Sequence, residues 1–227
     1  MINILSLFDG ISCGQVAFER AGILVNQYFA SEIDEKAIKV TQTNYPKTIQ
    51  LGSILNWESW DLPKIDILIG GSPCTGFSQA GKGLNFDDPQ SKLYFEFVKV
   101  LNAVKPKYFL LENVRMNKEF RDIISSDLGV KPIEINSALV SAQNRRRLYW
   151  TNIPNVSPPE DKGILLNKVL YHLPHGYKKE FVGLANKYPT LVAQSPGTKH
   201  KIVDNCELSE YAISRVNERL KNKTGLV

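Results

Sequence analysis

Short apolar runs alternate with segments of helical spacing from residue 3 to residue 152, and this alternation constrains the fold more than any other feature. The helical spacing predicts helices at residues 14–21, 35–43 and 93–104. The apolar runs predict strands at residues 3–8, 27–31, 48–51, 66–69, 108–111, 133–139 and 147–152. Strands that alternate with helices predict an α/β fold with a doubly wound sheet, in which ligand-binding loops follow the carboxyl ends of the strands.

The composition is that of a globular protein with basic character. Of the 227 residues, 43% are hydrophobic and 22% are charged, and the net charge is +5. A chain of this length holds one domain, or one domain with a small appendage. The positive charge weakly favours a polyanionic partner. The apolar start of the chain is too short for a membrane span and is interrupted by Asp9, so we expect neither a membrane segment nor a signal peptide.

The chain has three cysteines, Cys13, Cys74 and Cys206, which stand far apart. An odd number at such spacing is no disulfide framework, and no pair has the spacing of a zinc site. We therefore expect reduced thiols, no bound metal and a cytoplasmic location.

The loop after the first expected strand, SLFDGISCG, suits the approach of a ligand. Gly10 and Gly14 lack side chains, and the helix that follows offers free backbone N–H groups. Glu32 ends the second strand, at a spacing typical of a carboxylate that binds ribose hydroxyls. The third glycine of the dinucleotide fingerprint is missing, so a nucleoside-type cofactor and turns that only serve the fold both remain open. Ser53 is likewise either an adenine-facing residue or a polar turn residue.

The stretch GGSPCTGFS places a cysteine on a tight turn after the fourth expected strand. Cys74 could be packed there as a small apolar residue, or presented as a nucleophile. A thiol with a pKa of roughly 8.5 needs nearby positive charge or a base to become a thiolate. Glu112 and Asn113 follow the neighbouring strand, and the segment SAQNRRRLYW offers arginines. Each of these is also common as a turn, a cap or a solvated surface.

Five segments, SLFDGISCG, SEID, GGSPCTGFS, LLENV and QNRRRLYW, occur together in this order. In this combination the sequence resembles the DNA cytosine-5 methyltransferase family over roughly residues 1–155, and especially the branch that includes de novo methyltransferases and many phage and bacterial enzymes. The resemblance implies a doubly wound, Rossmann-like S-adenosylmethionine-dependent methyltransferase fold with a short, incomplete second region. It also implies double-stranded DNA as the partner, with a flipped-out cytosine as the methyl acceptor.

The resemblance assigns a cofactor site to the first loop and to the ends of the next strands. Glu32 would bind the ribose of S-adenosyl-L-methionine, and Ile33 would pack on the adenine. Ser53 stands where many relatives have aspartate near the adenine amine, so that hydrogen bond is expected to be weaker here. The expected cofactor-binding residues are Phe8, Asp9, Gly10, Gly14, Glu32, Ile33, Ser53, Ile54 and Leu93.

The resemblance also implies a covalent mechanism. The Cys74 thiolate would attack carbon 6 of cytosine and make carbon 5 enamine-like. Glu112 would bind the ring N3 and the exocyclic amine, and Arg145 would hold the carbonyl oxygen. The expected catalytic residues are Cys74, Glu112, Arg145, Pro73 and Asn113, and the expected DNA-contacting residues are Gln143, Arg147 and Ser78.

The resemblance implies a catalytic S-adenosylmethionine-binding domain at residues 1–157 and a partial small or target-recognition region at residues 158–227, and the residue pattern predicts a charged helix at 210–221. The late motifs of the family are not found. Three explanations remain open: a split enzyme completed by a second polypeptide, a truncated relic, or an unusually compact enzyme. A role in restriction-modification and a role in phage evasion of restriction also remain open.

Three other functions compete with this interpretation. A non-catalytic partner of another methyltransferase typically loses the Pro-Cys or Glu-Asn elements, which are intact here. A tRNA cytosine-5 methyltransferase typically carries a late Cys-Phe-Thr tripeptide, which is absent from the sequence. A nicotinamide-dependent dehydrogenase would use the same glycine loop but leaves Cys74, Glu112 and Arg145 unexplained.

Overall fold

The computed structural model describes residues 1–73, 89–165 and 188–189 of the chain. The chain divides into two units, one made of Met1–Ile135 with Arg146–Pro158, and the other of Asn136–Arg145 with Pro159–Val227. The elements are β1 (Ile2–Leu7), α1 (Cys13–Arg20), β2 (Val25–Ser31), α2 (Glu35–Asn44), β3 (Ile49–Gln50), the 3-10 helix η1 (Ile54–Ser59), β4 (Ile67–Gly70), α3 (Pro89–Val104), β5 (Tyr108–Val114), α4 (Lys118–Leu128), β6 (Ile133–Asn136), the 3-10 helix η2 (Ser137–Leu139), β7 (Gln143–Asn144), β8 (Arg146–Thr151) and β9 (Tyr188–Pro189).

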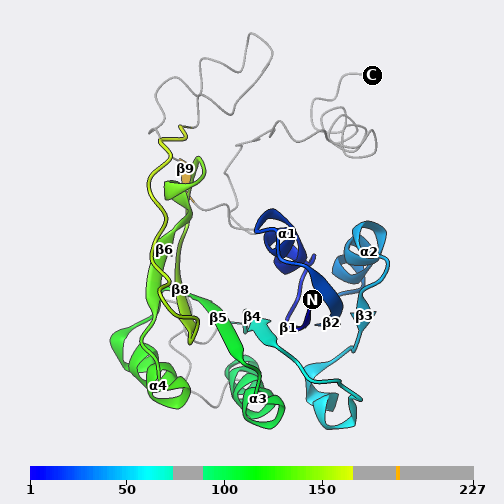
Figure 1. Cartoon of the computed structure of the whole chain (residues 1–227). Helices are drawn as coiled ribbons and strands as arrows, with labels where there is room; N and C mark the ends of the chain where they lie inside the picture. The colour runs from blue at the N-terminus through cyan, green and yellow to red at the C-terminus, as the bar shows by residue number, and fades with distance from the viewer. Residues whose placement is uncertain (74–88, 166–187, 190–227) are drawn as a thin grey trace, which may run out of the picture. The chain divides into compact units, whose positions relative to one another are not determined.

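A seven-stranded sheet with the order β3-β2-β1-β4-β5-β8-β6 forms the frame of the first unit (Figure 1). β1 pairs in parallel with β2 and β4, β2 with β3, and β4 with β5, whereas β8 runs antiparallel to β5. The chain adds β2 and β3 on one side of β1 and then β4 on the other, so the strand order reverses between β1 and β4. Open α/β sheets bind ligands at such a reversal, outside the carboxyl ends of the strands.

Apolar side chains cover both faces of this sheet. Successive residues of β1 point to opposite faces, as the period of a strand requires. On one face Ile4 packs with Tyr28 and Ala30, and with Phe18 of α1. The larger core on the other face includes Leu5, Leu7, Leu68, Phe97, Leu111, Ile124 and Trp150. Figure 1 accordingly shows α1 on one side of the sheet and α3 and α4 on the other.

The structure confirms the doubly wound order but corrects the strand expected at residues 133–139. β6 ends at Asn136 and η2 follows. The side-chain Oδ1 of Asn136 accepts a hydrogen bond from the backbone N–H of Ala138 at 3.1 Å. Such a local side-chain bond competes with the strand ladder and turns the chain out of it. The expected helix at residues 210–221 lies outside the described residues.

Sequence patterns also missed α4, although its signals are present. Phe120, Ile124 and Leu128 are buried at a spacing of four residues, which is one face of a helix. Asn117 caps its start by accepting from the N–H of Phe120 at 2.9 Å, and Gly129 follows its end with a φ of 67°. Within the described residues no helix is long and apolar enough to cross a membrane, and no three His, Cys, Asp or Glu side chains gather as metal ligands.

Candidate functional site

The loop that follows β1 holds an unusual backbone conformation. Phe8, Gly10 and Ser12 have positive φ angles of 56°, 60° and 60°. A residue with a side chain loses about 1–2 kcal/mol in this left-handed region, so Phe8 and Ser12 must be held there by their surroundings. Apart from Gly10 and its two neighbours in the chain, no atom of the described residues lies within 4 Å of the point where a Cβ on Gly10 would stand. The loop therefore presents bare backbone at the carboxyl end of β1.

Glu32 ties this loop to the end of β2. Its Oε2 accepts a hydrogen bond from the backbone N–H of Gly10 at 2.7 Å. Its Oε1 accepts from the N–H groups of Ile33 and Asp34, at 2.7 and 2.9 Å. The structure thus brings Glu32 to the glycine loop, while its contact with a ribose stays a prediction.

Asp9 lies between two hydroxyl groups. Its Oδ1 accepts a hydrogen bond from the Tyr28 hydroxyl at 2.8 Å, and its Oδ2 accepts one from Ser12. Tyr28 is 4% exposed. Burial, together with the charge of Asp9, raises the pKa of the Tyr28 phenol far above its ordinary value, so the hydroxyl remains a proton donor at neutral pH. Sequence reasoning missed Tyr28 and Ser12, because neither belongs to the glycine pattern.

Gly14 is required for packing. A Cβ at this position would stand 2.5 Å from Cδ1 of Ile69 and 2.7 Å from the hydroxyl oxygen of Tyr28. The missing side chain therefore lets α1 lie close to β2 and β4, and protein atoms fill the space that the sequence suggested for a ligand. A backbone contact of Gly14 with the cofactor stays a prediction.

The remaining expected cofactor residues have different surroundings. Ile33 is 73% exposed and offers an apolar side chain beside Glu32. Ser53 caps η1, where its Oγ accepts from the N–H of Leu55 at 3.3 Å, so it fills the polar turn role that the sequence left open. Ile54 is 4% exposed within the larger core, and Leu93 packs against the same core half-buried. Of these four residues, Ile33 presents the most accessible apolar surface.

Ser72 and Asn113 join the end of β4 to the end of β5. They are 4% and 2% exposed. The Nδ2 of Asn113 donates to Oγ and to the backbone oxygen of Ser72, at 3.2 and 3.4 Å, while its Oδ1 accepts from the N–H of Val114 at 2.8 Å. Pro73 follows directly, so this contact determines where the chain leaves β4. The expected residues Cys74 and Ser78 lie outside the described residues.

Glu112 stands at the same edge of the sheet, where it pairs with an arginine. A Cβ on Gly71 would stand 3.2 Å from the Oε2 of Glu112, so the carboxylate lies beside the chain that leaves β4. The Nε of Arg147 lies 2.8 Å from the Oε1 of Glu112, and these side chains are 14% and 32% exposed. In the ladder between β5 and β8, Arg147 is opposite Val114, two residues beyond Glu112. The arginine that the structure places beside Glu112 is therefore one that the sequence assigned to DNA contact.

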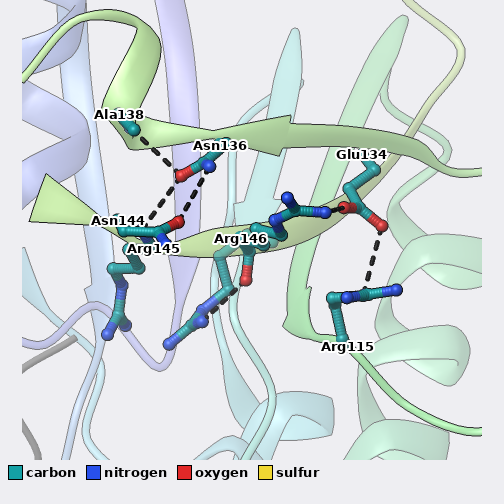
Figure 2. A network of polar contacts seen from close by, with 8 residues as sticks. Arg115, Glu134, Asn136, Ala138, Asn144, Arg145 and Arg146 are labelled. Atoms are coloured by element: carbon teal, nitrogen blue, oxygen red, sulfur yellow. Dashed lines mark hydrogen bonds and ion pairs between the residues drawn. The ribbon is translucent and has the colours of Figure 1, made fainter. Parts of the chain in front are cut away.

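The other two arginines of the cluster belong to separate networks (Figure 2). In the first unit, Arg146 and Arg115 both pair with Glu134, at 3.4 and 3.3 Å. In the second unit, the backbone N–H of Arg145 donates to the Oδ1 of Asn136 at 3.0 Å. Arg146 and Arg145 thus have different partners.

Gln143 also belongs to the second unit. It lies in β7, which pairs in parallel with β9, and its backbone oxygen accepts from the hydroxyl of Ser137 at 2.8 Å. The roles expected for Gln143 and Arg145 at the base and the DNA stay predictions.

The arrangement of the first unit defines a class of protein. Its strand order reverses at β1 and β4, a glycine-bearing loop follows β1, and a carboxylate ends β2, as in Rossmann-like folds that bind nucleoside cofactors. Solved structures align with this fold. A protein described as a DNA modification methyltransferase encoded within an E. coli prophage aligns with a TM-score of 0.61 and 24% identity, covering 77% of this chain and 56% of that one. A mutant of DNMT2 from Spodoptera frugiperda aligns with a TM-score of 0.56 and 22% identity, covering 77% and 61%.

Sequence comparison identifies the family. The family model of C-5 cytosine-specific DNA methylases matches residues 2–205, and the chain belongs to this family. The Type II methyltransferase M1.ScrFI of Lactococcus lactis is 37% identical over 159 residues, which cover 65% of this chain and 40% of that protein. M.BanI of Aneurinibacillus aneurinilyticus is 34% identical over 222 residues, which cover 89% and 50%. The chain thus spans about half, or less, of the length of these relatives.

Proposed function

We propose that the chain carries the catalytic part of a DNA (cytosine-5)-methyltransferase, which transfers a methyl group from S-adenosylmethionine to carbon 5 of a flipped-out cytosine in double-stranded DNA. The observation that carries the proposal is the meeting of three features at the ends of β4 and β5. These are the stretch from the end of β4 to Pro73, the buried contact of Asn113 with Ser72, and the ion pair of Glu112 with Arg147. Together they set acidic and basic groups beside the segment that leads into Cys74.

The residues at the ends of β1 and β2 fit S-adenosylmethionine, which supplies an electrophilic methyl group when bound. A carboxylate has about four acceptor sites, and the bonds described above use three of those of Glu32, so a ribose hydroxyl can still donate to it. The exposed side chain of Ile33 would pack on the adenine. The open space beside Gly10 would receive the amino-acid end of the cofactor.

The chemistry follows from the poor nucleophilicity of carbon 5 of cytosine. The Cys74 thiolate would form a bond from Sγ to carbon 6, which breaks the aromaticity and makes carbon 5 nucleophilic. Glu112 would bind the N3 edge and the exocyclic amine, and a proton shared at N3 would balance the negative charge that the thiolate brings into the ring. After carbon 5 takes the methyl group, a base would remove its proton and the thiolate would leave. Because a duplex hides these ring atoms, the base must first be flipped out.

We assign the contact with the base's carbonyl oxygen to Arg147, in place of Arg145. The Nε of Arg147 pairs with Glu112, and its Nη1 donates to the backbone oxygen of Arg146 at 2.8 Å. A guanidinium has five N–H donors in a rigid fork, so Nη2 would supply the bond to the carbonyl oxygen while Nε keeps its partner. Arg145 and Gln143 would then contact the DNA strand.

We further propose a catalytic domain at residues 1–157, a partial target-recognition region at residues 158–227, and a second polypeptide that completes the site. The complex would act on DNA in the cytoplasm.

The test is a methyl-transfer assay with labelled S-adenosylmethionine. The purified chain, alone and with the products of neighbouring genes, is incubated with duplex DNA and in parallel with tRNA, and bisulfite sequencing locates the modified base. We expect 5-methylcytosine in DNA that disappears in Cys74→Ser and Glu112→Gln. Label on adenine, on the cytosine amine or only on tRNA would refute the proposal, as would equal labelling by Cys74→Ser.

A further inference from the structure

A buried polar network fixes the loop that follows β1. Tyr28 donates to one carboxylate oxygen of Asp9, and Ser12 donates to the other. Ser12 is fully buried, and its Oγ lies 3.2 Å from the Nε2 of Gln15 and 3.2 Å from the Oγ1 of Thr41. Tyr28 of β2 and Ser12 therefore hold the carboxylate directly, and side chains from α1 and α2 hold Ser12 in turn.

The network has two further anchor points. The Nε2 of Gln15 donates to the Oγ1 of Thr48 at 2.8 Å, directly before β3. The Oγ1 of Thr41 lies 3.4 Å from the backbone oxygen of Gly10, whose N–H is bound by Glu32 at 2.7 Å. The side chains of α2 and of Glu32 thereby hold both backbone polar groups of Gly10.

The conformation held in this way is unfavourable for the isolated chain. Phe8 and Ser12 have side chains and yet adopt positive φ, at 56° and 60°. Residues in this region persist only where the surroundings determine them, and they gather at ligand-binding loops. The hydrogen bonds of Asp9 and Ser12 described above are part of these surroundings.

We propose that Tyr28 is a positioning residue of the cofactor loop. Its hydroxyl, acting through Asp9, keeps residues 8–12 in their ligand-binding shape before S-adenosylmethionine arrives. The inference rests on the proposed use of this cofactor. It gives Asp9 a task besides the expected direct contact, because two protein hydroxyls each donate to one of its carboxylate oxygens. A loop ordered before binding loses less entropy on binding, which lowers the dissociation constant without changing the chemical step.

A second tyrosine supplies a matched control. Tyr94 is also fully buried in the first unit, and its hydroxyl donates to the Oδ2 of Asp127 at 3.1 Å. It lies in α3 and packs in the larger core, whereas Tyr28 packs in the smaller core beneath α1. Tyr28→Phe and Tyr94→Phe each remove the hydroxyl of a buried tyrosine that donates to a carboxylate, which is half-buried for Asp9 and exposed for Asp127. A loss of stability alone would affect both variants alike.

The first readout is the affinity for S-adenosylmethionine by isothermal titration calorimetry. We expect Tyr28→Phe to raise the dissociation constant about tenfold, equivalent to about 1.4 kcal/mol. Tyr94→Phe is expected to leave the dissociation constant within about twofold of the wild-type value. Tyr28→Phe is expected to leave kcat at saturating cofactor within about twofold of the wild-type value. A wild-type protein that binds the cofactor, together with a Tyr28→Phe variant that binds equally well, would overturn the positioning role.

The second readout needs no cofactor and separates this inference from the proposed function. Hydrogen exchange of the unliganded protein should quicken in the peptide spanning residues 8–13 in Tyr28→Phe, and remain unchanged there in Tyr94→Phe. If the wild type binds no S-adenosylmethionine, the proposed cofactor is wrong, and exchange still decides whether Tyr28 orders the loop. Should Tyr28→Phe fail to fold, Ser12→Ala removes the bond to the other oxygen of Asp9 and should quicken the same peptide. Unchanged exchange in the folded variant would refute the inference.

Discussion

Two adjacent arginines, Arg146 and Arg147, allow the proposed catalytic edge to be tested against a matched control. Both lie in β8, both pair with a glutamate, and each is replaced by alanine in turn. They differ in their partners, because Arg147 pairs with the candidate catalytic Glu112 and Arg146 pairs with Glu134. Because each alanine variant loses one positive charge at an adjacent position, a difference in activity between them reports the partner of the arginine and not a general effect of basic residues.

The structure predicts different magnitudes for the two changes. The pair of Arg146 with Glu134 is 3.4 Å long and its side chains are 52% and 37% exposed, so its loss should cost about 0–0.5 kcal/mol of unfolding free energy. The pair of Arg147 with Glu112 is 2.8 Å long and more buried. Breaking a fully buried pair costs about 3–5 kcal/mol, so we expect about 1–2 kcal/mol for this partly buried one. Loss of a donor aimed at developing charge should lower kcat by about 10²–10³-fold.

Urea denaturation and steady-state methyl transfer measure the two effects. Arg147→Ala is expected to lose most of its kcat at a modest cost in stability, whereas Arg146→Ala keeps its kcat within about threefold. Arg147→Lys, which keeps the charge but lacks the planar fork, should recover only part of the rate. If Arg146→Ala and Arg147→Ala lose kcat equally, the assignment of Arg147 to the base is refuted.

Three further predictions concern the loops at the carboxyl ends of the strands. Gly14→Ala should lower the unfolding free energy by about 1–2 kcal/mol in urea denaturation, because overpacking outweighs the gain in helix propensity; a more stable variant would contradict the packing role. Burial raises the pKa of Tyr28 and Tyr94 above the ordinary value of 10.0, so the stability they contribute is present below pH 10 and is lost at higher pH. The double variant Tyr28→Phe/Tyr94→Phe should lose less unfolding free energy above pH 10 than the wild type, as measured by denaturation curves at several pH values. An unchanged dependence of the unfolding free energy on pH would contradict this prediction. Asn113→Asp replaces the amide group that donates to Ser72 with an oxygen, which would lie against the backbone oxygen of Ser72. This change should slow methyl transfer about tenfold at saturating cofactor; an unchanged rate would exclude a role for this contact.

Much of the scaffold was predictable from the sequence, because its signals are local. Strand and helix positions follow from apolar spacing and from stop signals. A glycine loop after one strand and an acidic residue after the next suffice to place Gly10 and Glu32 at the same edge of a parallel sheet. The turn at Asn136 was missed because the side-chain bond that ends β6 competes with a pattern that still looks like a strand.

The contacts that decide individual roles depend on tertiary register, which spacing does not encode. Which arginine meets Glu112 depends on how β8 aligns with β5, and α4 and β6 separate the two strands along the chain. The role of Gly14 depends on Ile69 and Tyr28, which come from two other strands. Such contacts become visible only once the sheet is assembled.

Trapping on DNA that contains 5-fluorocytosine tests the central claim most directly. The fluorine at carbon 5 cannot be removed as a proton, so the final elimination stops and the bond between the Cys74 sulfur and carbon 6 should persist. In the presence of S-adenosylmethionine, with any required partner polypeptide, we expect a denaturant-resistant protein–DNA adduct that maps to Cys74 by mass spectrometry and is absent from Cys74→Ser. A preparation that methylates cytosine in ordinary DNA but forms no such adduct, or forms it equally with Cys74→Ser, would contradict the account.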